Sequence, residues 1–168
     1  KTCLAIIFAA AATAAKAGIV TVDYTGTGRG QSVKIFQGSD SRNVFAGQLK
    51  HTISDAVGAD AYLNGMWLTY CSELSQTVAS NPAPYFTAPV SALPSSAPMG
   101  AAKAAAIFDI YRFAQSAPHT NSTSNDYATA FQLAIWEIVS DFDSNEGVSS
   151  LSLTAGALRA TRTNGSAL

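Results

Sequence analysis

The sequence predicts an α+β protein in which an antiparallel β-rich lobe, of sandwich or barrel type, precedes a helical lobe. Over much of the first half of the chain, polar and apolar residues alternate with the period of a β-strand. After Gly100, apolar residues recur at helical spacing instead. Strands early and helices late are typical of an α+β fold.

Composition limits the classes of function. The chain has 168 residues, enough for one domain with a real core or for two small lobes. Only 12% of residues are charged, about half the usual share, and the net charge is −1. Lys and Arg are scattered, with no basic stripe, so no nucleic-acid partner is expected. Low charge with many small polar residues is typical of an exported surface protein.

The N-terminus resembles a secretory signal peptide. Lys1 is followed by an apolar run too short to span a bilayer and then by an Ala-rich stretch that ends in Ala15-Lys16-Ala17. Cleavage after Ala17 leaves a mature protein that starts at Gly18 and has no transmembrane span. Cys3 departs with the signal, so Cys71 is the single cysteine in an oxidising compartment. A buried N-terminal helix is the alternative interpretation of residues 1–17.

Three alternating segments predict the first strands, at Ile19–Tyr24, Ser32–Phe36 and Asn43–Ile53. The glycine-rich stretch from Gly26 to Gly30 is expected to be a flexible turn between the first two. Within the third segment Gly47 is expected at a bulge, and His51 at a solvent-facing position.

A fourth strand is expected at Trp67–Cys71, after a turn at Asn64-Gly65, with an extended continuation from Ser72 to Val78. Five prolines between Ser80 and Pro98 make helix improbable in that loop. Tyr85–Val90 is expected to be a short edge strand within it.

Two helices are predicted in the second half, at Ala101–Ala114 and at Tyr127–Asp141, the latter capped by Asn125 or Asp126. Alternation at Ser150–Thr154 suggests one more strand, and Ala155–Leu168 is expected to begin a helix or loop. We therefore expect a single domain over residues 18–168, with a β-rich part to residue 98, a helical part to residue 145, and a C-terminal segment that is truncated.

The second predicted helix contains one polar misfit. Gln132 shares a helical face with Ile135, Trp136 and Val139, which draws its amide toward the core. A buried amide without partners costs about 1–3 kcal/mol. A hydrogen bond to a neighbouring loop is the simplest interpretation. In the second interpretation, Gln132 has a partner in the segment Tyr70–Leu74, which contains Cys71.

Two motifs resemble the thioester domains of bacterial surface proteins. One has the form Thr-Tyr-Cys-x-Glu-Leu-x-Gln and is matched by Thr69, Tyr70, Cys71, Glu73, Leu74 and Gln76. The other is the continuous run from Ala130 to Val139, Ala-Phe-Gln-Leu-Ala-Ile-Trp-Glu-Ile-Val. Together they are most similar to exported Gram-negative proteins of the PEP-CTERM-tagged type, although the sequence itself contains no such tag. Phe131 departs from the Gram-positive pattern, in which Thr often precedes the Gln.

The resemblance implies an internal thioester between Cys71 and Gln132. Such a bond serves one-shot covalent attachment to an amine or hydroxyl group, which is not enzymatic turnover. Tyr70 and Trp136 are expected to shield the bond from water, and Glu73, Gln76 and Glu137 to assist proton transfer. The implied partner is a surface protein or polysaccharide of a host, a neighbouring cell or the protein's own matrix. The expected location is the cell surface or extracellular matrix, with no cofactor and no metal.

Other functions remain open at this stage. The main alternative is an extracellular binding or structural module with the same fold, in which Cys71 is a buried thiol that forms no thioester. A Cys–His hydrolase would pair Cys71 with His51 or His119, but no Gly-rich oxyanion turn follows the cysteine. One cysteine and two scattered histidines lack the spacing of a metal site. Asp141 and Asp143 form an acidic pair that suits calcium.

Overall fold

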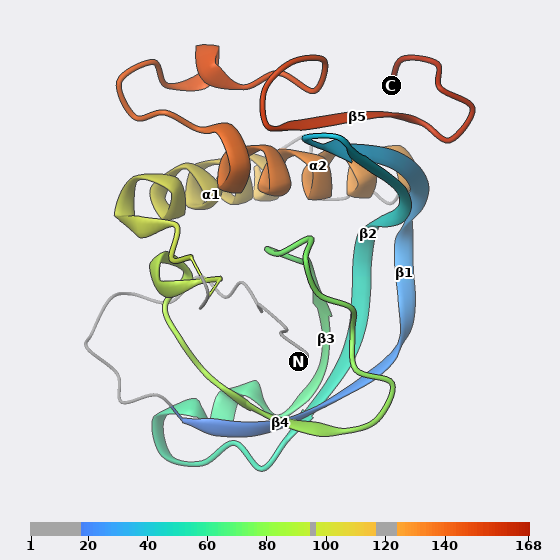
Figure 1. The fold of residues 1–168 in the computed structure, drawn as a ribbon. Coiled ribbons are helices and arrows are strands. Elements are labelled where there is room, and N and C mark those ends of the chain that lie inside the picture. Colours follow the sequence, from blue (N-terminus) through green and yellow to red (C-terminus); the bar gives the residue numbers. More distant parts are fainter. Residues whose placement is uncertain (1–17, 95–96, 117–123) are drawn as a thin grey trace.

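The computed structural model describes residues 18–94, 97–116 and 124–168 and confirms the α+β prediction (Figure 1). The predicted signal peptide and His119 lie outside these residues. The strands and main helices are β1 (Ile19–Gln37), β2 (Asp40–Ser54), β3 (Gly65–Thr69), β4 (Ala83–Phe86), α1 (Gly100–Gln115), α2 (Asn125–Asp141) and β5 (Leu158–Arg162). Short 3-10 helices lie at Gly58–Leu63, Val90–Ala92 and Val148–Ser150.

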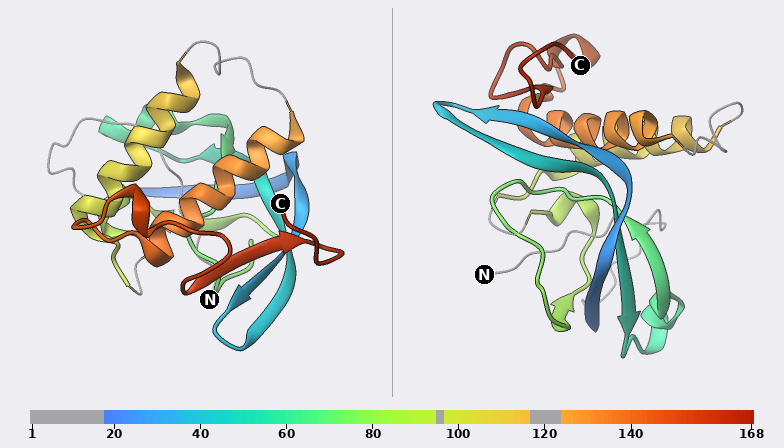
Figure 2. Two further views of the ribbon diagram at one scale, coloured as in Figure 1. Left: turned by 90° about the horizontal axis from the view of Figure 1, so that it is seen from above. Right: turned by 90° about the vertical axis from the view of Figure 1, so that its right-hand side faces the viewer.

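The long hairpin of β1 and β2 is the frame of a five-stranded antiparallel sheet. β3 pairs with β2 on one side. On the other side, β1 pairs with β4 near its start and with β5 near its end. Figure 2 shows the hairpin bending between these two ends, so that its far half runs alongside α2. The sheet therefore presents separate surfaces to separate parts of the core.

The bend coincides with irregular pairing, and the flexible turn predicted at Gly26–Gly30 is wrong. These residues continue β1, with register shifts between Tyr24 and Gly26 and between Thr27 and Gly30. The extra residues belong to β1, opposite the segment that contains Gly47. Gly30 and Gly47 face each other so closely that a Cβ on either would collide with backbone of the other strand. Glycine is required there by close approach of two strands.

His51 was expected at the surface, and this expectation is wrong, because its side chain is 1% exposed. Successive side chains of a strand point to opposite faces, so His51 shares a face with Leu49 and Ile53, which are also buried. Its Nδ1 lies 2.8 Å from the Thr69 hydroxyl of β3. A buried polar pair thus joins β2 and β3.

The two main helices agree with the predicted ranges, and they lie side by side over the sheet (Figure 2). The cap of α2 is Ser124, whose hydroxyl accepts the N–H of Tyr127 at 3.0 Å, rather than Asn125 or Asp126. α2 is buried on most of its circumference. Leu133 and Trp136 pack on β1, β2 and β5, whereas Ile135 and Ile138 pack on α1. None of the helices among the described residues has the length and apolar character needed to cross a membrane.

Four other predicted segments differ from the structure. β3 ends at Thr69, so Cys71 opens a loop with bends, and Ser72–Val78 is not an extended continuation. Ser150–Thr154 is not a strand, because turns follow a short 3-10 helix there. The strand comes later, as β5, within the Ala155–Leu168 segment for which helix or loop was expected. The edge strand predicted at Tyr85–Val90 lies earlier, as β4, which shares only Tyr85 and Phe86 with the predicted range.

Candidate functional site

Gln132 and Cys71, which lie 61 positions apart, meet through two hydrogen bonds. The backbone N–H of Cys71 donates to Gln132 Oε1 at 2.8 Å. Gln132 Nε2 donates to the backbone carbonyl of Cys71 at 2.7 Å. The Gln132 side chain is 1% exposed, so the amide is buried with both ends engaged. The misfit in α2 is therefore bound to the residue that carries the thiol.

Local structure explains why these two residues meet. Gln132 lies in the middle of α2, on the same face as Trp136, which packs into the core against β1, β2 and β5. Three residues earlier, the Thr129 hydroxyl donates to the carbonyl of Ala46 in β2 at 3.1 Å, which docks α2 on the sheet. Cys71 lies two residues after Thr69, where β3 ends, and β3 pairs with β2. The sheet thus carries Cys71 to the helix.

The Cys71 side chain is a thiol and is partly buried. Its sulfur donates to the backbone carbonyl of Glu73 at 2.7 Å. Cys71 and Leu74 pack against the cluster that contains Leu133 and Trp136. The thiol therefore lies at the margin of the core, where it has partial access to solvent, and not deep within it.

The loop after Cys71 is fastened at several points. Arg42 Nη2 donates to the backbone carbonyl of Leu74 at 2.7 Å and to Gln37 Oε1 at 2.8 Å. The Glu73 carboxylate accepts Gln76 Nε2 at 2.9 Å and also the Ser75 hydroxyl. These contacts hold the loop against the end of the β1–β2 hairpin.

Sequence reasoning missed Arg42, and no local pattern reveals it, because its partner is a backbone carbonyl 32 positions away.

Aromatic side chains flank the pair. Tyr70 packs edge-on against Phe131, with ring centroids 4.7 Å apart, so the residues directly before Cys71 and Gln132 are in contact. Burial raises the pKa of Tyr70, although a hydrogen bond with Gln48 opposes the shift. The phenol is therefore neutral at ordinary pH. Trp136 is 3% exposed, and its Nε1 has no hydrogen-bond partner within the described residues.

Glu137 points to a different side of α2 from Gln132. It lies five residues after Gln132, which turns it by about 140° around the helix. Its Oε1 accepts the backbone N–H of Ser152 at 2.6 Å, and the residue lines a cavity on that side of α2. Two of the predicted supporting residues, Tyr70 and Glu73, belong to the Cys71 segment. Gln76 contacts Glu73, and Trp136 belongs to the core cluster on which Cys71 packs. Glu137 makes its contact with Ser152 instead.

The residues considered for other chemistry are engaged differently. The ring of His51 packs near Tyr24, and its Nδ1 lies within hydrogen-bond distance of the Thr69 hydroxyl, so neither contact is with Cys71. Asp141 accepts the backbone N–H groups of Ala157 and Leu158 at 2.8 and 2.9 Å. In the described part of the chain, no group of three or more His, Cys, Asp or Glu side chains is arranged to hold a metal ion.

Comparison of the chain with models of protein families, with curated proteins and with solved structures finds no match. The chemistry of the site must therefore be argued from its own residues.

Proposed function

We propose that Cys71 and Gln132 form an internal thioester, through which the protein attaches once and covalently to an amine or hydroxyl group of its target. The observation that carries the proposal is the pair of hydrogen bonds between the Gln132 carboxamide and the Cys71 backbone. They hold a buried amide against the residue that carries the thiol and fix its orientation. Positioning of this kind lowers the activation barrier of intramolecular reactions.

Bond formation needs a rotation of the Cys71 side chain. The thiol gives up its hydrogen bond to the Glu73 carbonyl, turns toward Gln132 and attacks Cδ as the thiolate. Negative charge then develops on Oε1, which already accepts the Cys71 N–H, as in an oxyanion hole. The Cδ–Nε2 bond breaks, and the nitrogen leaves as ammonia with the proton that the thiol lost. The Glu73 carboxylate lies in the same loop and is suited to carry that proton.

Attachment reverses the roles of the two residues. An amine or hydroxyl of the target adds to Cδ, and Cys71 departs and regains a proton. Gln132 is left joined to the target by an amide or ester bond. Because the thioester is not regenerated, each molecule acts once. A surface protein or polysaccharide at the cell exterior or in a matrix offers the required nucleophiles, in keeping with the predicted export.

One observation favours a second function, that of a binding or structural module without a thioester. The Gln132 amide is already satisfied by the Cys71 backbone, so the pair is stable as two hydrogen bonds. In this case Gln132 only fastens the Cys71 loop to α2. The two functions differ in whether the protein reacts with amines.

The intact mass of the protein decides between the thioester and the module without one. A thioester lowers the mass of the protein by one ammonia relative to its sequence, and methylamine should then add at Gln132 and expose a titratable thiol at Cys71. Cys71→Ala and Gln132→Ala should each abolish both signals, whereas Gln115→Ala, at an exposed position of α1, should change neither. Full sequence mass with no methylamine adduct on freshly prepared protein would refute the thioester and leave the module.

A further inference from the structure

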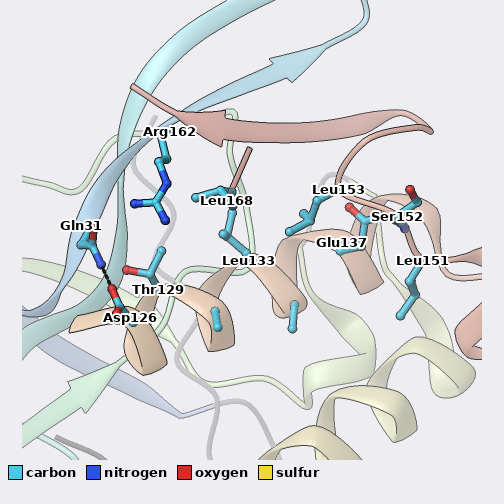
Figure 3. A pocket seen from close by; sticks show the side chains of 12 residues that line it. Gln31, Asp126, Thr129, Leu133, Glu137, Leu151, Ser152, Leu153, Arg162 and Leu168 are labelled. Atoms are coloured by element: carbon cyan, nitrogen blue, oxygen red, sulfur yellow. Dashed lines mark hydrogen bonds between the residues drawn. The ribbon is translucent and has the colours of Figure 1, made fainter. Parts of the chain in front are cut away.

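A cavity of about 520 Å³ lies beside α2, on the side that carries Glu137 (Figure 3). Its floor is one face of the helix, including Asp126, Leu133 and Glu137 at spacings of seven and four residues. Its roof is the segment Leu151–Leu153 and the end of the chain around β5. The volume is in the range of small-molecule sites. Neither Cys71 nor Gln132 lines this cavity.

The cavity is exposed at one end and buried at the other. Asp126 and Arg162, at the first end, are exposed, and Figure 3 shows Arg162 extending toward α2, where Asp126 accepts a hydrogen bond from Gln31. Glu137, at the other end, is 3% exposed. Between the ends the walls are apolar, with Leu133, Ala134 and Leu153. The cavity is thus an apolar slot with a carboxyl group at its inner end.

The Glu137 carboxyl group is only half satisfied. Oε1 accepts the Ser152 N–H at 2.6 Å, but Oε2 is buried and has no hydrogen-bond partner among the described residues. Burial raises the pKa of Glu137, the Ser152 bond opposes the shift, and Asp141 adds to it. A buried carboxylate oxygen without a donor is costly, so a donor that reaches it gains free energy. A cationic donor gains most, because charge-assisted hydrogen bonds are the stronger ones.

We propose that this slot binds an aliphatic primary ammonium ion. A rotation of the Glu137 carboxyl group brings the enclosed Oε2 to the cavity wall, where it accepts a hydrogen bond from the ammonium group. The alkyl chain lies along Leu133, Ala134 and Leu153 and points toward the exposed end of the slot. A carboxylate ligand of the same length is disfavoured, because it would place a second negative charge beside Glu137. A neutral alcohol fits the walls but lacks the charge. Binding is reversible and separate from the chemistry at Cys71.

The test uses n-hexylammonium, with hexanoate and hexanol as ligands of equal length. Because a primary amine would open a thioester, binding is measured by calorimetry on the full chain with Cys71→Ala, in which none can form. We expect saturable binding of n-hexylammonium, weakened about tenfold or more by Glu137→Gln, which keeps the side-chain shape and an acceptor for Ser152. Glu146→Gln removes an exposed carboxylate outside the cavity and should leave the affinity unchanged. Hexanol should bind more weakly, and hexanoate should not bind.

Absence of saturable binding would overturn the proposal, as would equal affinity for hexanoate or an unchanged affinity in Glu137→Gln. If Glu137→Gln does not fold, Ala134→Leu decides, since a larger side chain at this partly buried wall position fills the slot. A folded Ala134→Leu protein that still binds n-hexylammonium would refute the site. The covalent methylamine adduct of the unmodified protein reports only on the thioester, so the two proposals fail separately.

Discussion

Gln132 ties two segments of the molecule together with a single side chain. Its carboxamide has one acceptor and one donor group, and each is used by the backbone of Cys71. Both bonds are made to main-chain groups of a partly buried residue that lies two positions after the end of β3. The same two bonds that fasten the loop also hold the amide against the residue that carries the thiol. In the proposed function, a structural and a chemical role coincide at Gln132.

Removing the Gln132 side chain should destabilise the protein even where no thioester can form. In a Cys71→Ala background, Gln132→Ala removes the two hydrogen bonds to the backbone of residue 71 and leaves a cavity beside α2. We expect a loss of about 2–4 kcal/mol in the free energy of unfolding, measured by urea denaturation. Gln115→Ala, on the exposed surface of α1, should change it by no more than about 0.5 kcal/mol. Equal stability of the two variants would show that the hydrogen bonds to residue 71 contribute nothing.

His51 should make stability depend on pH. Burial lowers the pKa of His51 from 6.5 to about 4, although Asp23 opposes the shift. Between these values the unfolded chain binds a proton at His51 and the folded protein does not, so stability falls as the pH is lowered through this window. The difference of about 2.5 pKa units corresponds to an upper value of about 3.5 kcal/mol, at about 1.4 kcal/mol per unit.

The measurement compares the wild type with His51→Gln in urea at pH 7 and pH 4, because carboxylates that titrate in both proteins cancel in the difference. The stability advantage of the wild type should shrink by about 2–3 kcal/mol over this range. A difference that stays constant would mean that the histidine titrates normally and is not held neutral by the fold.

At the scale of elements, hydrophobic periodicity predicted those helices and strands whose formation depends on local sequence. α2 and the two halves of β1 have strong hydrophobic periodicity, and the structure has them close to the predicted ranges. β5 was missed, although Leu158 and Ala160 alternate with Arg159 and Thr161, because the strand is short and most of its residues are weak strand formers. It is stabilised by tertiary contacts: Leu158 and Ala160 are buried, and Asp141 accepts the N–H groups at its start.

The glycine-rich stretch of β1 shows a different limit of sequence reasoning. Glycine clusters usually end a strand, and here they allow one to bend while it continues. Whether a glycine marks a turn or a bulge depends on the strand opposite, and the chain segment alone does not contain that information. The close approach of Gly30 and Gly47 becomes visible only when β1 and β2 are paired.

Substitution of Gly47 and of Gly38 by alanine should lower the stability of the protein by different amounts. A Cβ at Gly47 would collide with the Arg29 carbonyl, and its φ of 156° is unfavourable for other residues. We expect Gly47→Ala to cost about 2–4 kcal/mol in the free energy of unfolding. Gly38→Ala, in the hairpin turn, has a φ of 60° but open space around the new methyl group, so about 1 kcal/mol is expected. Thermal unfolding of both variants checks the ranking, and a smaller loss at Gly47 would contradict the close packing.

At the scale of the whole molecule, the Cys71 segment lies where two parts of the core meet. Cys71 and Leu74 pack with the cluster formed by the far half of the β1–β2 hairpin, β5 and α2. Tyr70, one residue earlier, packs with the cluster between α1 and α2. No single element determines this position, which is why the sequence indicated the Cys71–Gln132 pair only through a polar misfit and a family resemblance. The geometry of the pair depends on the sheet and both helices together.

The predicted cleavage after Ala17 would change a set of contacts at the start of the described residues. The backbone N–H of Gly18 donates to the Thr87 hydroxyl at 2.8 Å, and that hydroxyl donates to Asp60 Oδ2 at 2.9 Å. The backbone N–H of Thr87 in turn donates to the Gly18 carbonyl at 2.9 Å. If cleavage follows Ala17, the nitrogen of Gly18 becomes a positively charged α-amino group close to the Asp60 carboxylate. The processed protein would then gain an attraction that the unprocessed chain lacks.

We therefore expect the protein recovered from its natural host to begin at Gly18, as determined by N-terminal sequencing. In that processed form, Asp60→Asn should lower the free energy of unfolding by about 0.5–1 kcal/mol, the usual value of a partly exposed ion pair. The same substitution in a chain that retains residues 1–17 should cost less, because a peptide nitrogen carries no charge. Asp109→Asn, on the exposed side of α1, serves as the control for the general effect of removing a carboxylate. Recovery of a chain that still carries Lys1 would refute the cleavage and restore Cys3 as a second cysteine, and an equal cost of Asp60→Asn in both forms would show that the new terminus does not pair with Asp60.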